Sequence, residues 1–250
     1  MSRAPGEARP ALSLLARLGV SVKEGKTLGV YGPSMVGKSV LAAVVAREYV
    51  GDEGTAVVFG VEPHYADEEY REVLKQFLPR HHYINVCEST PKLYEYMSIV
   101  RRARLEGKVA LMLDSLSFIA MRETAEWSMK GVNEPRVIAA RVIPAVYTVA
   151  SAFKQLVVEK RALGIVVMHA GSTAGAGKYR GLVDYRPSMA ARVAHSLDYL
   201  VLVESEGASL DAPRKLTLVA SRLTPMYEGR AVRFRFKDGS VEEVAEAGGG

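Results

Sequence analysis

The sequence predicts an α/β fold in which a mostly parallel sheet lies between helices and ends in antiparallel strands. Two observations support this class. Apolar runs typical of buried strands alternate with segments of helical spacing over most of the chain. After residue 197 the pattern changes to strand-like runs separated by turn residues, with no helix between them. The chain has 250 residues, of which 48% are hydrophobic, so it suits one domain with a large packed core.

The first part of the chain contains the β-α alternation, and its ends are marked by residues that stop or start helices. Gly51 and Pro79 end two helices, while Pro91 and Gly107 lie in the first turn and at the end of a third. A long fourth helix should bend near Pro144. We expect strands at 27–32, 54–62, 82–87, within 108–120 and at 165–171, and helices at 38–50, 66–78, 91–107 and 135–164.

The last part of the chain should extend the sheet with antiparallel pairs. The strand-like runs there are 198–204, 215–221, 231–236 and 240–244. The sequence thus predicts one domain over 12–245, between a flexible N-terminal segment, 1–11, and a flexible tail, 246–250.

The composition limits the cellular compartment and the classes of partner that we expect for this protein. The N-terminal ten residues have no apolar signal core, and no apolar run reaches the length of a membrane span, so we expect a cytoplasmic protein without a membrane partner. The single cysteine, Cys87, cannot form an internal disulfide and is expected to be buried in a strand. The formal net charge of +5 permits contact with nucleic acid without demonstrating it.

The segment YGPSMVGKS, residues 31–39, carries the clearest chemical signal. Its Gly32, Gly37, Lys38 and Ser39 fit the phosphate-loop pattern G-x-x-x-x-G-K-[ST]. The glycines let backbone N–H groups surround an anion, the lysine reaches the β- and γ-phosphates, and the serine hydroxyl ligates Mg²⁺. The loop follows an apolar strand and opens a helix, as this chemistry requires. The predicted binding residues are Gly32, Pro33, Ser34, Met35, Val36, Gly37, Lys38, Ser39 and Val40.

Three polar residues end other predicted strands. Asp114 suits the Mg²⁺ side of the loop, Glu62 could orient and activate the attacking water, and His169 could sense the γ-phosphate. The alternative roles, in the same order, are a buried structural aspartate, an ordinary loop carboxylate, and a histidine at the edge of the sheet whose hydrogen bonds are met within the protein. Tyr70 and Arg71 are candidates to pack on adenine, although a tyrosine on a helix face is more often part of the core. The expected cofactors are ATP and Mg²⁺.

The order of these motifs resembles the ATPase core of the RecA/RadA recombinase superfamily, which includes KaiC-type ATPases. The resemblance spans 12–245. Its more specific parts are the Asp-Ser pair after the apolar strand LMLDS and the turn S-R-L-x-P-x-x-E-G at 221–229. It implies a RecA-like P-loop NTPase core that binds and hydrolyses ATP. The sequence has no ABC-type signature. It also has no N-K-x-D or T-K-x-D run, which would recognise guanine, so GTP is not expected.

Departures from the family pattern refine this expectation. The short segment before the phosphate loop leaves no room for the N-terminal helical DNA-binding domain of RadA, and no F-x-x-A motif is present. The resemblance is therefore to core-only archaeal RadA paralogues of the RadB type, which implies an accessory role in recombinational DNA repair and a RadA recombinase partner. It also implies a homo-oligomer or hetero-assembly, in which Arg222 acts on a neighbouring subunit's ATP and Pro225 caps that nucleotide.

The resemblance further implies two DNA-facing loops, with single strands preferred. One matches 121–135, with Arg122, Trp127 and Lys130, and the other matches 171–188. The second carries Lys178, Tyr179, Arg180 and Arg186. Cations could contact phosphates and the aromatic rings could stack on bases, but mobile surface loops are the alternative.

Two other functions stay open: a KaiC-like signalling ATPase that acts on protein partners, and an ATP-binding assembly factor with little hydrolysis, as in archaeal motility-motor relatives.

Overall fold

The computed structural model describes residues 10–172, 185–187, 193, 196–207, 209 and 211–244. The strands are β1 (Thr27–Gly32), β2 (Thr55–Gly60), β3 (His81–Val86), β4 (Val109–Asp114), β5 (Leu163–Ser172), β6 (Tyr185–Pro187), β7 (Tyr199–Ser205), β8 (Arg214–Ser221), β9 (Ala231–Lys237) and β10 (Ser240–Glu243). The helices are α1 (Pro10–Arg17), α2 (Lys38–Val50), α3 (Glu68–Lys75), α4 (Thr90–Arg102), α5 (Leu116–Met129) and α6 (Pro135–Glu159), with 3₁₀ helices η1 (Pro63–Ala66) and η4 (Pro225–Tyr227).

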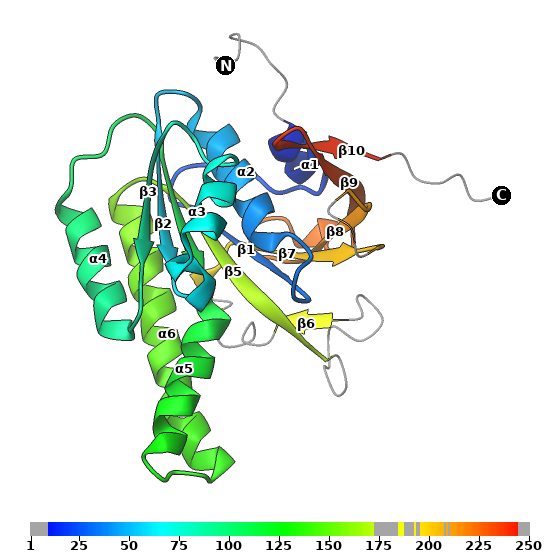
Figure 1. Ribbon diagram of the computed structural model, residues 1–250. Coiled ribbons are helices and arrows are strands. Elements are labelled where there is room, and N and C mark those ends of the chain that lie inside the picture. Colours follow the sequence, from blue (N-terminus) through cyan, green and yellow to red (C-terminus); the bar gives the residue numbers. More distant parts are fainter. Residues whose placement is uncertain are drawn as a thin grey trace.

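The strands form one twisted sheet in the order β10-β9-β8-β7-β1-β5-β4-β2-β3 (Figure 1). The strands from β7 to β3 in this order pair in parallel, whereas β8, β9 and β10 pair antiparallel. The short strand β6 pairs antiparallel with the far end of β5. The predicted α/β class, with a mostly parallel sheet and antiparallel C-terminal strands, is confirmed.

Helices cover both faces of the sheet. As a consequence, strands such as β1, β2 and β4 are buried along their whole length. One apolar cluster lies between the sheet and α1, α2 and α3; it includes Leu14, Leu41 and Leu74. A second lies under α4, α5 and α6 and includes Leu93 and Val146. This two-sided packing fixes the ends of the parallel strands, and the candidate site lies at those ends.

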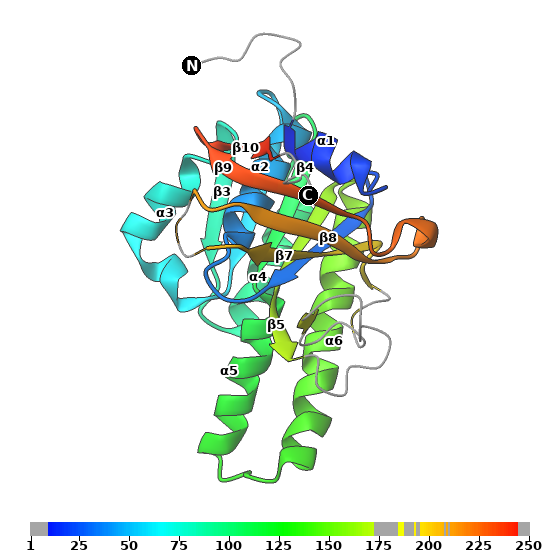
Figure 2. The ribbon, with the colours of Figure 1, turned by 90° about the vertical axis from the view of Figure 1, so that its right-hand side faces the viewer.

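Residues 121–135 do not form the loop that the sequence analysis expects. Helix α5 continues to Met129 and α6 begins at Pro135, so only a short turn joins them. The hydroxyl of Ser115 caps α5 by accepting a hydrogen bond from the backbone N–H of Phe118, and most residues that follow are good helix formers. Figure 2 shows α5 and α6 extending side by side beyond the sheet. The expected loop is therefore wrong, and the segment is part of a helical hairpin.

Several element bounds also differ from the sequence prediction. Helix α1 begins at Pro10, inside the segment expected to be flexible, because Leu14 and Leu15 pack into the core. Cys87 is buried as expected, but it follows the last residue of β3 instead of lying within the strand. Helix α6 contains Pro144 and ends at Glu159, and β5 begins shortly afterwards.

Helix α6 is long and apolar enough to cross a membrane by length and composition alone, with a mean hydropathy of 1.4 over an 18-residue window. Its inner face supplies Val146, Val149 and Phe153 to the core against β5 and α5. In that window 28% of the helix is buried, and this packing accounts for the apolar character of the buried face.

Candidate functional site

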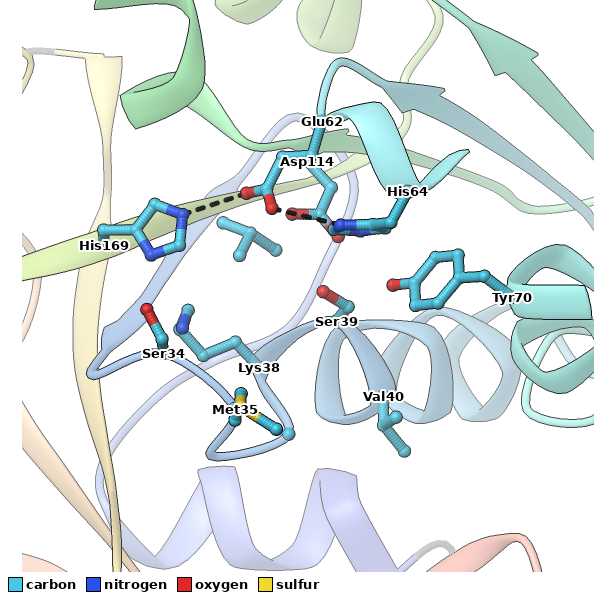
Figure 3. Close-up of a pocket in the computed structure, with 12 residues that line it drawn as sticks. Ser34, Met35, Lys38, Ser39, Val40, Glu62, His64, Tyr70, Asp114 and His169 are labelled. Carbon is cyan, nitrogen blue, oxygen red and sulfur yellow. Dashed lines mark hydrogen bonds and ion pairs between the residues drawn. The ribbon is translucent and has the colours of Figure 1, made fainter. Parts of the chain in front are cut away.

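The register of the parallel strands brings the predicted polar residues to one edge of the sheet. Gly32, which ends β1, lies opposite His169 of β5, and Gly60, which ends β2, lies opposite Asp114 of β4. These carboxyl ends and the start of α2 surround a cavity of about 490 Å³ (Figure 3). Its lining residues are Ser34, Met35, Gly37, Lys38, Ser39, Val40, Glu62, His64, Tyr70, Asp114, Val167 and His169.

The phosphate loop takes a backbone shape that depends on Gly37. Gly37 has a φ of 87° and caps the N-terminus of α2, and Met35 also has a positive φ, of 63°. A Cβ atom on Gly37 would lie 2.5 Å from Cε2 of Phe236, which packs behind the loop. Only glycine fits both the backbone angle and the space. The loop therefore presents the N-terminus of α2 to the cavity, and a helix N-terminus favours an anion.

Lys38 is almost buried, with 6% of its surface exposed, and its side chain lies over the cavity (Figure 3). Its Nζ donates a hydrogen bond of 2.5 Å to the carbonyl of Pro33. Burial lowers the pKa of Lys38, while the nearby charges of Asp114 and Glu62 act to raise it. A buried ammonium group with no paired carboxylate at hydrogen-bond distance in the described part of the chain is suited to receive an anionic ligand.

Asp114 is fully buried at the base of the cavity. Its Oδ2 accepts a hydrogen bond of 2.6 Å from the hydroxyl of Tyr65, whereas its buried Oδ1 has no hydrogen-bond partner within the described residues. Burial raises the pKa of this carboxyl and so does the charge of Glu62, while interactions with the hydroxyls of Ser39 and Tyr65 lower it. An unpaired carboxylate oxygen close to a serine hydroxyl is an oxygen-ligand environment that fits Mg²⁺. The peptide bond from Asp114 to Ser115 is cis.

Glu62 lies between two histidines, one from each side of the cavity. Its Oε1 is 3.1 Å from Nε2 of His169, and its Oε2 is 3.4 Å from Nδ1 of His64 (Figure 3). Burial acts to raise the pKa of Glu62, but hydrogen bonds from His169 and Ser115 and the nearby histidines bring it below its usual value. Glu62 is therefore a carboxylate at neutral pH, which a proton acceptor must be.

Beside the cavity lies an aromatic cluster that the sequence pattern did not predict; His64 and Tyr70 line the cavity, and Tyr65 does not. The rings of His64, Tyr65 and Tyr70 pack together, with centroids 4.1 to 5.2 Å apart. The hydroxyl of Tyr70 points toward Ser39, and burial raises its pKa to about 12. Pro63 directly after Glu62, followed by two aromatic residues, was the available signal for this cluster.

Arg71 does not line the cavity. Its guanidinium donates hydrogen bonds to the carbonyls of Tyr65 and Ala66, at 2.6 and 2.9 Å. The structure thus brings Tyr70 into the site, on the side of Ser39, and directs Arg71 to the backbone of η1.

The residues expected to face DNA are placed only in part. Trp127 is on α5, with Nζ of Lys130 4.9 Å and Cζ of Arg141 5.4 Å from its ring centroid. Arg122 points inward and donates to the carbonyl of Cys87 at 3.1 Å. Lys178, Tyr179 and Arg180 lie outside the described residues, and Arg186 is the middle residue of β6.

Arg222 and Pro225 lie far from this cavity. Ser221, which precedes Arg222, pairs with Tyr199, and Tyr199 pairs with Leu28 near the amino end of β1. Both residues are exposed at the edge of the sheet opposite the phosphate loop.

Comparisons with known proteins agree with the fold. No protein-family model matches the chain. No curated protein matches it either. Among solved structures, the crystal structure of the RadB recombinase matches with a TM-score of 0.61 over 93% of this chain and 97% of that chain. The two sequences are 15% identical, so the likeness shows a shared fold. The RecA-like fold that the motifs predict is confirmed.

Proposed function

We propose that this protein is a RecA-family ATPase that binds ATP with Mg²⁺ and hydrolyses it. One observation carries the proposal: Lys38, Ser39, Asp114 and Glu62 meet around one cavity at the N-terminus of α2. These are the cation, hydroxyl, metal-side carboxylate and base that phosphoryl transfer to water requires. A RecA-like fold with this set of residues at the carboxyl ends of its strands favours an ATPase over a passive glycine-rich turn.

Each residue has a distinct role in the proposed reaction. The backbone N–H groups of the phosphate loop and Lys38 bind the phosphates, and Lys38 stabilises the charge that develops in the transition state. Ser39 and Asp114 would hold Mg²⁺, which neutralises phosphate charge when bound. Glu62 takes a proton from the attacking water. His169 contacts Glu62 through Nε2, and in the proposed reaction it would exchange that contact for one with the γ-phosphate.

The test is nucleotide binding measured by isothermal titration calorimetry. Lys38→Ala should lose most of the affinity for ATP with Mg²⁺, because the loop lysine offsets phosphate charge directly. Lys92→Ala is the matched control, since Lys92 pairs with Glu95 on the surface of α4. Glu62→Gln should bind ATP but hydrolyse it roughly 10²-fold more slowly. Unchanged ATP affinity in Lys38→Ala would contradict the assignment.

We further propose that the protein binds single-stranded DNA and assists homologous recombination, alongside a RadA recombinase. The support is the likeness in fold to RadB together with the cations and tyrosine of 171–188 in the sequence. Replacing Lys178 and Arg180 by alanine should lower the affinity and reduce the salt slope by up to roughly two units. If the parent binds no DNA in a fluorescence anisotropy titration at low salt, a signalling ATPase or an assembly factor is the better assignment.

The last parts of the proposal concern the oligomeric state of the protein and the compartment in which it acts. A homo-oligomer or hetero-assembly would place Arg222 and Pro225 against a neighbour's nucleotide, because they are exposed at the edge opposite their own chain's cavity. We propose that the protein acts in the cytoplasm.

A further inference from the structure

A buried arginine lies directly behind the phosphate loop. Arg214, the first residue of β8, has 2% of its surface exposed. Its Nε donates a hydrogen bond of 2.8 Å to the carbonyl of Val36, inside the loop. The other guanidinium nitrogens donate to the carbonyls of Ala212, at 2.7 Å, and Ser209, at 3.4 Å. The guanidinium also stacks on Phe236, with Cζ 4.7 Å from the ring centroid.

Arg214 is on the far side of the loop from the cavity. It is absent from the cavity lining, whereas its Nε would be 3.5 Å from a Cβ atom on Gly37. Arg214 therefore reaches the nucleotide site only through the loop. Burying a guanidinium is costly unless its donors are paired, and here main-chain carbonyls from two separate segments supply hydrogen bonds. The arrangement joins the phosphate loop to the turn that precedes β8.

The bond to Val36 has a specific geometric consequence. The peptide bond between Val36 and Gly37 is trans, because the only cis bond among the described residues is that after Asp114. In a trans peptide the carbonyl and the N–H point in opposite directions. Arg214 holds the Val36 carbonyl on the side of the loop away from the cavity, so the Gly37 N–H of the same peptide should point toward the cavity. That N–H is one of the donors that a phosphate loop uses to bind its anion.

We propose that Arg214 is a positioning residue of the nucleotide site. It holds the Val36–Gly37 peptide in the orientation that binds phosphate, and it places a positive charge behind the loop. The inference rests on the proposed ATPase function and adds a residue that does not touch the ligand. It assigns to Arg214 an effect on the affinity for nucleoside di- and triphosphates, with little effect on the chemical step.

The test compares three variants by calorimetry with ADP and Mg²⁺ and by steady-state ATP hydrolysis. Arg214→Met keeps the length and apolar stem but removes the donors and the charge. We expect its Kd for ADP and its KM for ATP to rise roughly tenfold or more, with kcat little changed. Arg214→Lys keeps the charge without the planar fork, so it should recover part of the affinity. Arg235→Met is the matched control, because Arg235 lies on the surface of the neighbouring strand β9 and pairs with Glu242 of β10.

The outcomes separate this inference from the function on which it rests. If Arg214→Met binds ADP as tightly as the parent, the inference is wrong and the ATPase assignment stands. If the parent binds no nucleotide, both are wrong. A large fall in kcat with unchanged KM would also overturn the inference.

A loss of folding in Arg214→Met is detected by its melting curve without nucleotide. If that variant does not fold, hydrogen exchange on the unaltered protein tests the coupling between Arg214 and the phosphate loop. ADP should slow exchange in peptides covering 211–214 as well as in the loop, and equal exchange at 211–214 with and without ADP overturns the inference.

Discussion

The hydroxyl of Tyr65 donates a hydrogen bond of 2.6 Å to Oδ2 of Asp114, and both side chains are fully buried. The bond fixes the rotation of the carboxylate and leaves Oδ1 unpaired among the described residues. Gly60 makes room for the tyrosine, since a Cβ atom there would lie 2.2 Å from Cγ of Tyr65. Tyr65 thus acts on the candidate metal site without reaching the cavity itself, as an outer partner of a metal ligand does.

The first prediction concerns this bond. Tyr65→Phe should raise the Mg²⁺ concentration needed for half-maximal ATP hydrolysis by roughly tenfold, because outer partners orient metal ligands. The free energy of unfolding should fall by about 1–3 kcal/mol, since one oxygen of a buried carboxylate loses its partner. A Mg²⁺ titration and thermal unfolding measure the two effects. Tyr83→Phe, at an exposed position on β3, is the control. An unchanged Mg²⁺ requirement in Tyr65→Phe would show that the bond does not orient the ligand.

The second prediction separates backbone strain from steric clash in the phosphate loop. Gly37 and Gly131 have similar positive φ angles, 87° and 81°, but only Gly37 faces Phe236, and Gly131 has open space around it. Gly131→Ala should therefore lose only the strain energy, about 1 kcal/mol, and should keep ATP binding. Gly37→Ala should lose more stability and most of its ATP affinity. Calorimetry and thermal unfolding of both variants test this, and equal behaviour of the pair would contradict the role assigned to Phe236.

The sequence predicted which side chains meet at the candidate site, because their approach depends on local patterns and on one rule of parallel sheets. Lys38 and Ser39 were found from their spacing, and Asp114, Glu62 and His169 were found because each ends or follows an apolar strand. The carboxyl ends of parallel strands share an edge, so these side chains had to approach one another.

The residues that support the site could not be found in this way. Arg214 is 178 positions from Val36, and Tyr65 is 49 positions from Asp114, so each contact depends on tertiary packing. The family resemblance implies a loop at 121–135, but helix propensity and the cap at Ser115 extend α5 through most of this segment. Residues 178–180, expected in the second DNA loop, lie outside the described part of the chain.

The third prediction concerns pH. Hydrolysis needs the Glu62 carboxylate, whose pKa is below its usual value, so activity should persist to a pH below the ordinary range of a glutamate. Burial is the largest single influence on this pKa and acts to raise it, and the hydrogen bond from His169 is the largest of the influences that lower it. His169→Ala should therefore raise the pKa of Glu62 and shift the acid limb of the kcat profile to higher pH. His82→Ala is the control, because His82 contacts the carbonyl of Pro79. An acid limb that does not move in His169→Ala would exclude this coupling.

The last prediction follows from the place of Arg222. The strand β1 has six residues and spans roughly 20 Å, with Arg222 near its amino end and the phosphate loop at its carboxyl end. Arg222 therefore cannot stabilise charge on the nucleotide of its own chain. The surface around it is partly apolar, with Leu223 44% and Met226 73% exposed, which suits a contact with another subunit. If Arg222 takes part in hydrolysis, it must do so in a neighbouring copy.

Mixing two inactive variants tests this directly. Lys38→Ala chains cannot bind ATP but carry Arg222, and Arg222→Ala chains bind ATP but lack the arginine. A mixture should form interfaces that combine an intact phosphate loop with an intact arginine, so its turnover should exceed the sum of the separate proteins. Turnover per chain in the parent should also rise with protein concentration, because the complete site forms only on association. Two results together would show that each chain hydrolyses ATP alone. The mixture would be no more active than its parts, and the turnover per chain of the parent would not depend on protein concentration. The candidate base, the metal-side carboxylate and Lys38 would then have to suffice without a second cation from a neighbour.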